Sequence, residues 1–90
     1  MRQWFVYILR CVDGSLYTGI TTDPARRIRE HNAGRAAAAR YTLGRRPVEL
    51  AYCEPATDRS EASRREAAIK QLSREAKLAL CASADGRTPE

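Results

Sequence analysis

Two runs of aromatic and β-branched residues near the start of the chain predict a β-hairpin. They span residues 4–12 and 16–22, and Asp13-Gly14 lies between them. Two such runs around an Asp-Gly pair are the strongest short-range signal for a hairpin. We therefore expect the first two elements to be antiparallel strands joined by a tight turn.

A helix is expected over residues 24–33. Asp23 can accept hydrogen bonds from its first turn, Pro24 suits the first helical position, and Gly34 tolerates the left-handed conformation that ends a helix. Residues 35–46 follow, with arginines and an all-alanine stretch, and are compatible with either a short helix or an ordered loop.

Strict alternation returns at residues 47–54 and predicts a third strand. Val48, Leu50 and Tyr52 are expected on one of its faces, with polar or small residues on the other. Prolines precede and follow the strand, which suits an edge position or the ends of a strand.

The rest of the chain predicts two helices and a tail. Asp58 and Glu61 have the spacing of a capping box, which begins a helix through about residue 72, and Ser73 can cap a shorter one. We therefore predict one α/β (α+β) domain over residues 1–81. It contains a small three-stranded antiparallel sheet flanked by helices, in the order β-β-α-β-α-α, and residues 82–90 form a flexible tail.

Composition excludes several classes of protein. The 90 residues contain three isolated cysteines and one histidine, which argues against a zinc cluster and against a disulfide framework. We expect the three thiols to be small buried groups. No apolar run is long enough to span a membrane, and the start does not resemble a secretion signal, so we expect a cytoplasmic protein.

The positive charge is concentrated in one part of the chain. The formal net charge is +5, yet residues 24–46 alone carry +6, with seven arginines against Glu30. Such a block attracts polyanions, above all the phosphates of nucleic acids, although a merely solvated basic surface would show the same composition.

Two tyrosines and a glycine could share one face of the hairpin, depending on its turn. A two-residue turn would pair Arg10 with Tyr17 and place Tyr7 on the opposite face. A three-residue turn, or a bulge, would pair Cys11 with Tyr17 and place Tyr7, Tyr17 and Gly19 together. Because glycine weakens a strand, Gly19 also indicates a point where another group approaches the backbone.

Three polar residues on the helices are candidates for chemistry. Arg27 and His31 are four residues apart and share a helical face, where they could meet a phosphate and carry a proton, although a capping or surface histidine is equally compatible. Glu66 lies beside an apolar stripe, so it needs a partner: Arg65, a proton or a metal ion.

These residues, in this order, resemble the GIY-YIG nuclease superfamily. Phe5-Val6-Tyr7 stands in the place of GIY and Tyr17-Thr18-Gly19 in the place of YIG, with Arg27 and Glu66 at the expected positions downstream. The similarity covers about residues 3–80 and is strongest to small stand-alone bacterial members. The same module forms the N-terminal nuclease domain of the UvrC repair protein.

The resemblance implies a role for each candidate residue. Glu66 would hold a single divalent cation, Mg²⁺ or Mn²⁺, and Arg27 would neutralise the scissile phosphate. Tyr17 would transfer a proton, directly or through water, while Tyr7 and His31 would position or activate the attacking water. The flanking DNA backbone would be bound by the basic block: Arg26, Arg35, Arg40, Arg45 and Arg46.

The function implied is that of a metal-dependent endonuclease acting on DNA. Branched or damaged DNA is a candidate substrate, DNA repair a candidate process, and a protein partner could supply specificity. The alternative is a non-catalytic nucleic-acid-binding module on the same scaffold, which would need the arginines alone.

Overall fold

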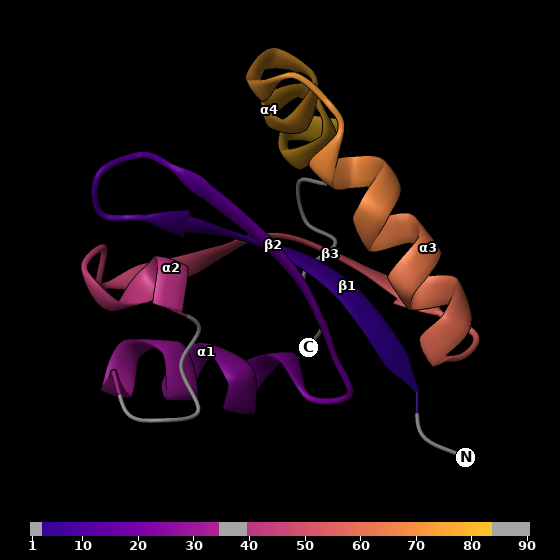
Figure 1. The fold of residues 1–90 in the computed structure, drawn as a ribbon, viewed down its shortest axis with the longest axis horizontal. Helices are drawn as coiled ribbons and strands as arrows, with labels where there is room; N and C mark the ends of the chain where they lie inside the picture. Colours follow the sequence, from indigo (N-terminus) through magenta and orange to yellow (C-terminus); the bar gives the residue numbers. More distant parts are fainter. Residues whose placement is uncertain (1–2, 35–39, 84–90) are drawn as a thin grey trace.

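A computed structural model describes residues 3–34 and 40–83 of the chain (Figure 1). The order of strands and helices is the predicted one, with a short helix added before the third strand. The elements are β1 (Trp4–Cys11), β2 (Leu16–Thr21), α1 (Pro24–Ala33), α2 (Arg40–Leu43), β3 (Val48–Ala56), α3 (Arg59–Lys70) and α4 (Arg74–Ser83).

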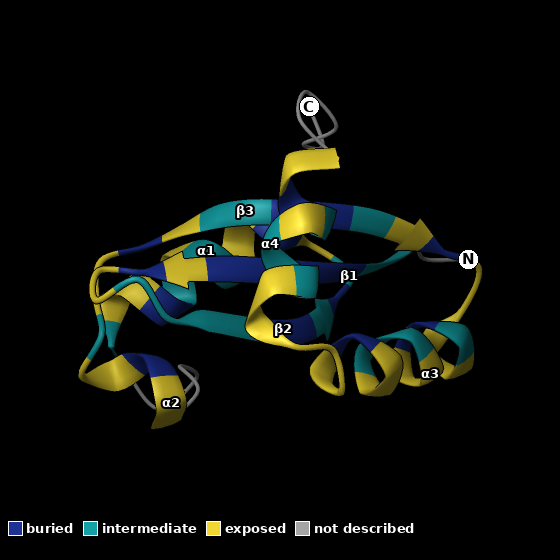
Figure 2. Cartoon of the chain, turned by 90° about the horizontal axis from the view of Figure 1, so that it is seen from above, coloured by how far each residue is buried: buried dark blue, intermediate teal, exposed yellow. Residues whose placement is uncertain are grey.

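The three strands form one antiparallel sheet with β1 in the centre, in the order β2-β1-β3. Helices cover both faces: α1 and α2 lie on one side of the sheet, and α3 and α4 on the other (Figure 1). Because β1 is covered from both sides, it is almost entirely buried, as Figure 2 shows. Neighbouring residues of β1 therefore face two different environments.

The hairpin turn comprises residues 12–14. The backbone amide of Cys11 donates to the carbonyl oxygen of Ser15 at 2.9 Å, and Gly14 takes a positive φ of 85° in the turn. Tyr17 therefore lies opposite Leu9. Both partners predicted for Tyr17, Arg10 and Cys11, were wrong. Cys11 and Ser15 close the turn, and counting residue pairs from them places Leu9 opposite Tyr17.

The face that matters is nevertheless the one expected for a three-residue turn. Tyr7 of β1 pairs with Gly19 of β2, and Tyr17 lies two residues before Gly19 on β2. Because side chains alternate with a period of two, Tyr7, Tyr17 and Gly19 lie on one face of the sheet.

A β-bulge changes which residues of β3 share a face. The pairing with β1 shifts between Leu50 and Tyr52, which leaves Ala51 without a cross-strand partner. The prediction that Val48, Leu50 and Tyr52 share one face is therefore wrong. Val48 and Leu50 pack on the side of α1, and Tyr52 packs on the side of α3. One extra residue in a strand reverses the facing of every residue beyond it.

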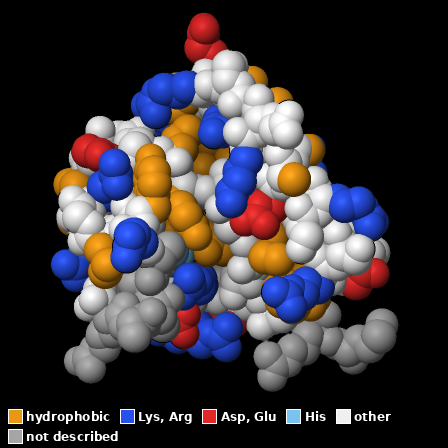
Figure 3. Space-filling model, in the orientation of Figure 1, with side chains coloured by type: hydrophobic (Ala, Val, Ile, Leu, Met, Phe, Trp, Pro, Cys, Tyr) orange, Lys and Arg blue, Asp and Glu red, His pale blue; other side chains and the backbone are white. Residues whose placement is uncertain are grey.

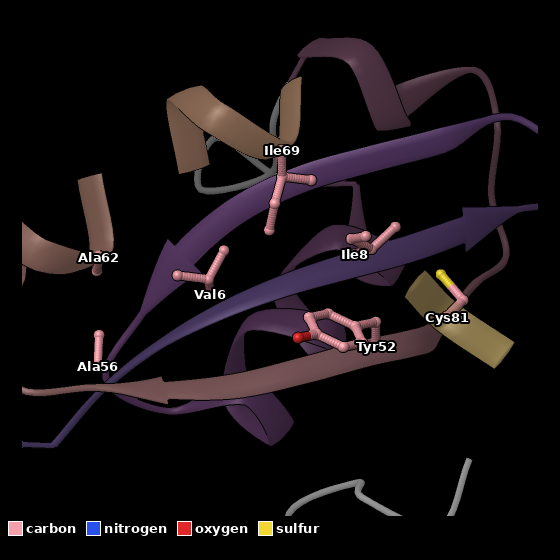
Figure 4. Packing of buried hydrophobic residues seen from close by; sticks show 7 residues of the cluster. All are labelled: Val6, Ile8, Tyr52, Ala56, Ala62, Ile69 and Cys81. Atoms are coloured by element: carbon pink, nitrogen blue, oxygen red, sulfur yellow. The ribbon is translucent and has the colours of Figure 1, made fainter. Parts of the chain in front are cut away.

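The side of the sheet under α3 and α4 forms the larger apolar core (Figure 4). The sequence pattern predicts an apolar stripe on α3 formed by Ala62, Ile69 and Leu72. The stripe is confirmed for Ala62 and Ile69, which are buried, but Leu72 is 38% exposed because α3 ends at Lys70. All three cysteines are buried, as predicted. The buried residues of this core are Val6, Ile8, Tyr52, Ala56, Ala62, Ile69 and Cys81.

Side chains fix where the helices begin and end. Asp23 accepts from the amide of Arg26 at 3.1 Å, and Gly34 ends α1 with a φ of 68°. Asp58 and Ser73 cap α3 and α4 in the same way. Helix α4 continues to Ser83, two residues into the segment predicted as a tail, and the rest of that segment lies outside the described residues.

The segment for which helix or loop was left open contains α2. Residues 35–39, which precede it, lie outside the described residues, and Arg35 with them. In residues 3–34 and 40–83, no helix has the length and apolar character needed to cross a membrane.

Candidate active site

Tyr7 is the central residue of the face under α1. It is 2% exposed, and its ring lies directly over Gly19 on the neighbouring strand. A Cβ atom at position 19 would lie 2.5 Å from the phenolic oxygen of Tyr7, which is closer than a real contact allows. The group that approaches the backbone at Gly19 is therefore the ring of Tyr7, which glycine admits to this position.

A chain of hydrogen bonds runs from Tyr7 into the protein. The phenolic oxygen lies 3.1 Å from Nε2 of His31, and Nδ1 of His31 lies 2.8 Å from Oγ1 of Thr42. Arg27, which can only donate, also hydrogen-bonds Tyr7. Each ring nitrogen of His31 therefore has one hydroxyl partner, Tyr7 at Nε2 and Thr42 at Nδ1.

His31 lies deeper than a proton carrier in contact with substrate would. It is 0% exposed, and burial, reinforced by the positive charge of Arg27, lowers its pKa to about 4. The imidazole is therefore neutral at pH 7, and both ring nitrogens are occupied by Tyr7 and Thr42. This arrangement suits a residue that orients Tyr7.

The phenol of Tyr7 is a hydrogen-bond donor at neutral pH. Burial raises its pKa to about 12, helped by the nearby Tyr17 and Glu66 and opposed by Arg27. A phenol with so high a pKa is a poor general base at pH 7.

Tyr17 lies at the more accessible end of the same cluster of rings. It is partly buried, and its ring centroid lies 6.4 Å from that of Tyr7, 5.3 Å from that of His31 and 5.7 Å from that of Tyr41. Tyr41 is 38% exposed. The rings therefore form a path from buried Tyr7 through Tyr17 to the surface at Tyr41.

Arg27 is positioned by α1 on the same side. Its side chain is 22% exposed, and Nη1 lies 2.9 Å from Oε1 of Glu30, which also pairs with Arg26 at 3.5 Å. Arg27 thus combines a contact with Tyr7 with partial access to solvent. A partly exposed guanidinium is the side chain best suited to bind a phosphate.

Glu66 is the acidic residue that α3 contributes. Its side chain is 23% exposed, and Oε2 lies 3.2 Å from Nζ of Lys70. Arg65, expected as its partner, instead pairs with Glu54 at 2.9 Å. Residues four apart on a helix share a face, which explains why Lys70 rather than adjacent Arg65 reaches the carboxylate.

The residues present fit one weakly held divalent cation. The described part of the chain has no group of three or more His, Cys, Asp or Glu side chains that could enclose a metal ion. Mg²⁺ is usually held by one or two carboxylates and completes its shell with waters and substrate phosphates. Glu66, with one oxygen engaged by Lys70, matches that donor set and would hold such an ion.

The arginines of the basic block have different surroundings. Arg45 pairs with Asp13 at 3.2 Å and lies over the ring of Tyr41, and Arg46 donates to the backbone of α1 and α2. Arg40 is exposed at the start of α2. Lys and Arg side chains surround a band of hydrophobic side chains on the face seen in Figure 3.

Sequence reasoning missed two residues of this site, Thr42 and Tyr41. Both lie on α2, in the segment whose conformation was left open, and neither belongs to a recognisable motif. Their spacing from His31 along the chain carries no signal, because only the packing of α2 against α1 brings them together.

Comparison with known proteins shows which proteins this chain is similar to. The model of the GIY-YIG catalytic domain matches residues 3–79. A UPF0213 protein of Desulfotalea psychrophila is 69% identical over 78% of this chain, a match that spans 63% of that relative's length. A UPF0213 protein of Halobacterium salinarum is 56% identical over 83% of this chain and 95% of the relative.

Two solution structures are also similar to this chain. A UPF0213 protein from Bacillus halodurans is 44% identical with a TM-score of 0.59, and the match covers 93% of this chain and 87% of that one. A protein from E. faecalis is 38% identical with a TM-score of 0.63, covering 100% of this chain and 94% of that one.

Proposed function

The chain belongs to the GIY-YIG catalytic domain family, a nuclease-like scaffold, and from this premise we propose that it is a divalent-metal-dependent endonuclease acting on DNA. One observation carries the proposal. The rings of Tyr7 and Tyr17 lie on one face of the sheet with centroids 6.4 Å apart, and the charges of Arg27 and Glu66 both affect the pKa of the Tyr7 phenol. This arrangement supports a site in which a guanidinium, a carboxylate and two phenols act on one phosphate.

Each residue contributes a distinct part of phosphodiester hydrolysis. Arg27 neutralises charge on the scissile phosphate through its guanidinium, whose side chain is partly exposed. Tyr17, the more accessible of the two tyrosines, moves the proton between the attacking water and solvent. A divalent cation bound at Glu66 supplies charge neutralisation at the phosphate and makes a phenol or water easier to deprotonate.

Tyr7 and His31 act as positioning residues in this proposal. The hydrogen bonds from Arg27 through Tyr7 and His31 to Thr42 fix the ring of Tyr7 against Gly19. That ring in turn limits where Tyr17 and Arg27 can lie. Because Tyr7 is protonated and His31 neutral at pH 7, neither takes the proton of the attacking water.

Nicking of supercoiled plasmid and cleavage of branched or damaged duplexes, with Mg²⁺ or Mn²⁺, test the proposal. We expect Glu66→Gln and Arg27→Ala each to lower the rate by about 10²-fold or more, while DNA binding persists. Glu75→Gln is the matched control, because Glu75 is exposed at the start of α4. Its rate should equal that of the unmodified chain.

Two outcomes would contradict the proposal. Nicking that persists unchanged in Glu66→Gln and Arg27→Ala would point to a contaminating nuclease. DNA binding without cleavage of any substrate, with either metal, would instead favour the non-catalytic binding module. Cleavage that appears only after a protein partner is added would retain the proposal and assign specificity to that partner.

A further inference from the structure

A pocket lies between the β1–β2 hairpin, α2 and α4, and Tyr41 forms part of its wall. Its volume is about 190 Å³. It combines apolar side chains with two basic side chains that lie outside the basic block. The residues that line it are Ser15, Leu16, Tyr41, Arg74 and Lys77.

The basic side chains of this pocket lack acidic partners. Arg74 and Lys77 are three residues apart on α4 and share a face. Neither forms an ion pair within residues 3–34 and 40–83. In the same ranges Arg29, Arg40, Arg46, Arg59 and Arg64 also form no ion pair, but none of them lines this pocket. The other six basic side chains do form ion pairs: Arg10, Arg26, Arg27, Arg45, Arg65 and Lys70. Two positive charges without partners at one pocket favour an anion there.

The wall of the pocket offers flat surfaces beside those charges. Tyr41 lies 5.7 Å from Tyr17 between ring centroids, and Cζ of Arg45 lies 4.2 Å from the ring centroid of Tyr41. Aromatic rings and guanidinium planes stack on the bases of unpaired nucleotides, while nearby cations follow the backbone. In Figure 3, hydrophobic side chains on this face lie between Lys and Arg side chains.

We propose that this pocket binds a backbone phosphate of an unpaired DNA strand that runs from the candidate active site past Tyr41. Arg74 and Lys77 neutralise the phosphate, and a neighbouring base stacks on the Tyr41–Arg45 pair. A base inside a duplex could not do so, because its faces are covered by adjacent base pairs. The inference rests on the proposed function and adds to it a substrate with a single-stranded segment.

The test measures binding of a labelled oligothymidylate strand over a series of salt concentrations, with no divalent metal, so that cleavage does not interfere. For single strands, each phosphate contact contributes about 0.7 to the slope of log affinity against log salt. Because both side chains contact the same phosphate, we expect the double variant to lower the slope by about that amount in total, and Arg74→Ala and Lys77→Ala each to lower it by a part of that amount.

Arg64→Ala is the matched control. It removes one exposed arginine from α3, where Arg64 forms a hydrogen bond to Ser60 but no ion pair within the described ranges. Its slope should equal that of the unmodified chain. A blunt duplex of the same length is the second control, and the α4 variants should bind it as the unmodified chain does.

Unchanged slopes in Arg74→Ala and Lys77→Ala would overturn the inference and leave the proposed nuclease untouched. Equal losses for the single strand and the blunt duplex would overturn the assignment of an unpaired strand. The two proposals fail separately, since nicking tests the nuclease and metal-free binding tests the pocket.

Discussion

The two faces of the sheet are built from the same central strand but stabilised by different interactions. Val6 and Ile8 face α3 and α4 and belong to the larger cluster of buried apolar side chains. Tyr7, between them, faces α1 and α2 and lies in a chain of buried polar groups. We call these the apolar face and the tyrosine face.

The two faces separate the residues that stabilise this small domain from those proposed to carry its chemistry. The apolar face can tolerate any side chain of suitable volume, because dispersion and the hydrophobic effect have little directionality. The tyrosine face depends on donors and acceptors that match one to one, from Arg27 through Tyr7 and His31 to Thr42. Changes to it should affect activity first.

Truncation of the apolar face should have the largest effect on stability. Ile69 is 0% exposed at the centre of that core (Figure 4). Ile69→Ala should lower the free energy of unfolding by about 2–5 kcal/mol, through lost burial and the cavity left behind. Urea denaturation measures this loss. The nicking rate per folded molecule should stay near that of the unmodified chain. A loss of nicking larger than the loss of folded protein would contradict the division between the two faces.

The tyrosine face should give stability a pH dependence. Folding lowers the pKa of His31 from 6.5 to about 4, so the unfolded chain takes up a proton first as pH falls. Stability from this group is complete above pH 6.5 and decreases by about 3 kcal/mol as pH falls to 4. Urea denaturation at several pH values measures it, with His31→Gln as the comparison.

In His31→Gln the decrease between pH 6.5 and 5 should be largely absent, because carboxyl groups contribute mainly at lower pH. An equally steep decrease in both proteins would mean that His31 is not held neutral by the fold.

Matched threonines on the two faces should differ by a smaller amount. Thr42→Val removes the hydroxyl group that is the partner of His31 Nδ1 and should cost about 1–3 kcal/mol while slowing nicking, since a buried ring nitrogen loses its hydrogen bond. Thr18→Val, at a buried position of β2 opposite Ile8, should cost less and leave nicking unchanged. Thermal denaturation and plasmid nicking compare the pair, and equal effects would remove the distinction.

The sequence could predict whatever local patterns determine. The Asp-Gly turn, the caps at Asp23 and Asp58 and the glycine after α1 each act within a few residues, and all are found in the structure. The bulge at Ala51 could not be foreseen, because an alternating pattern reads the same with or without one skipped partner. It reverses the facing of Tyr52 and so decides which core that ring joins.

The candidate site was predictable only in part, for the same reason. Tyr7, Tyr17, Arg27 and His31 could be named from residue type, spacing and family resemblance. The burial that keeps His31 neutral, and the contact with Thr42, depend on how α2 packs against α1. Lys70 as the partner of Glu66 follows from helix geometry and could have been expected from the four-residue spacing.

One pair of variants tests the division between the two faces most directly, because each variant removes one tyrosine hydroxyl group and the two groups lie on different faces. Tyr17→Phe changes the partly exposed ring of the tyrosine face, and Tyr52→Phe changes a ring of the apolar face whose hydroxyl donates to Glu54. Metal-dependent plasmid nicking should fall by about 10²-fold in Tyr17→Phe and stay unchanged in Tyr52→Phe, which should lose only about 1 kcal/mol of stability. Equal nicking rates in the two variants would contradict the account.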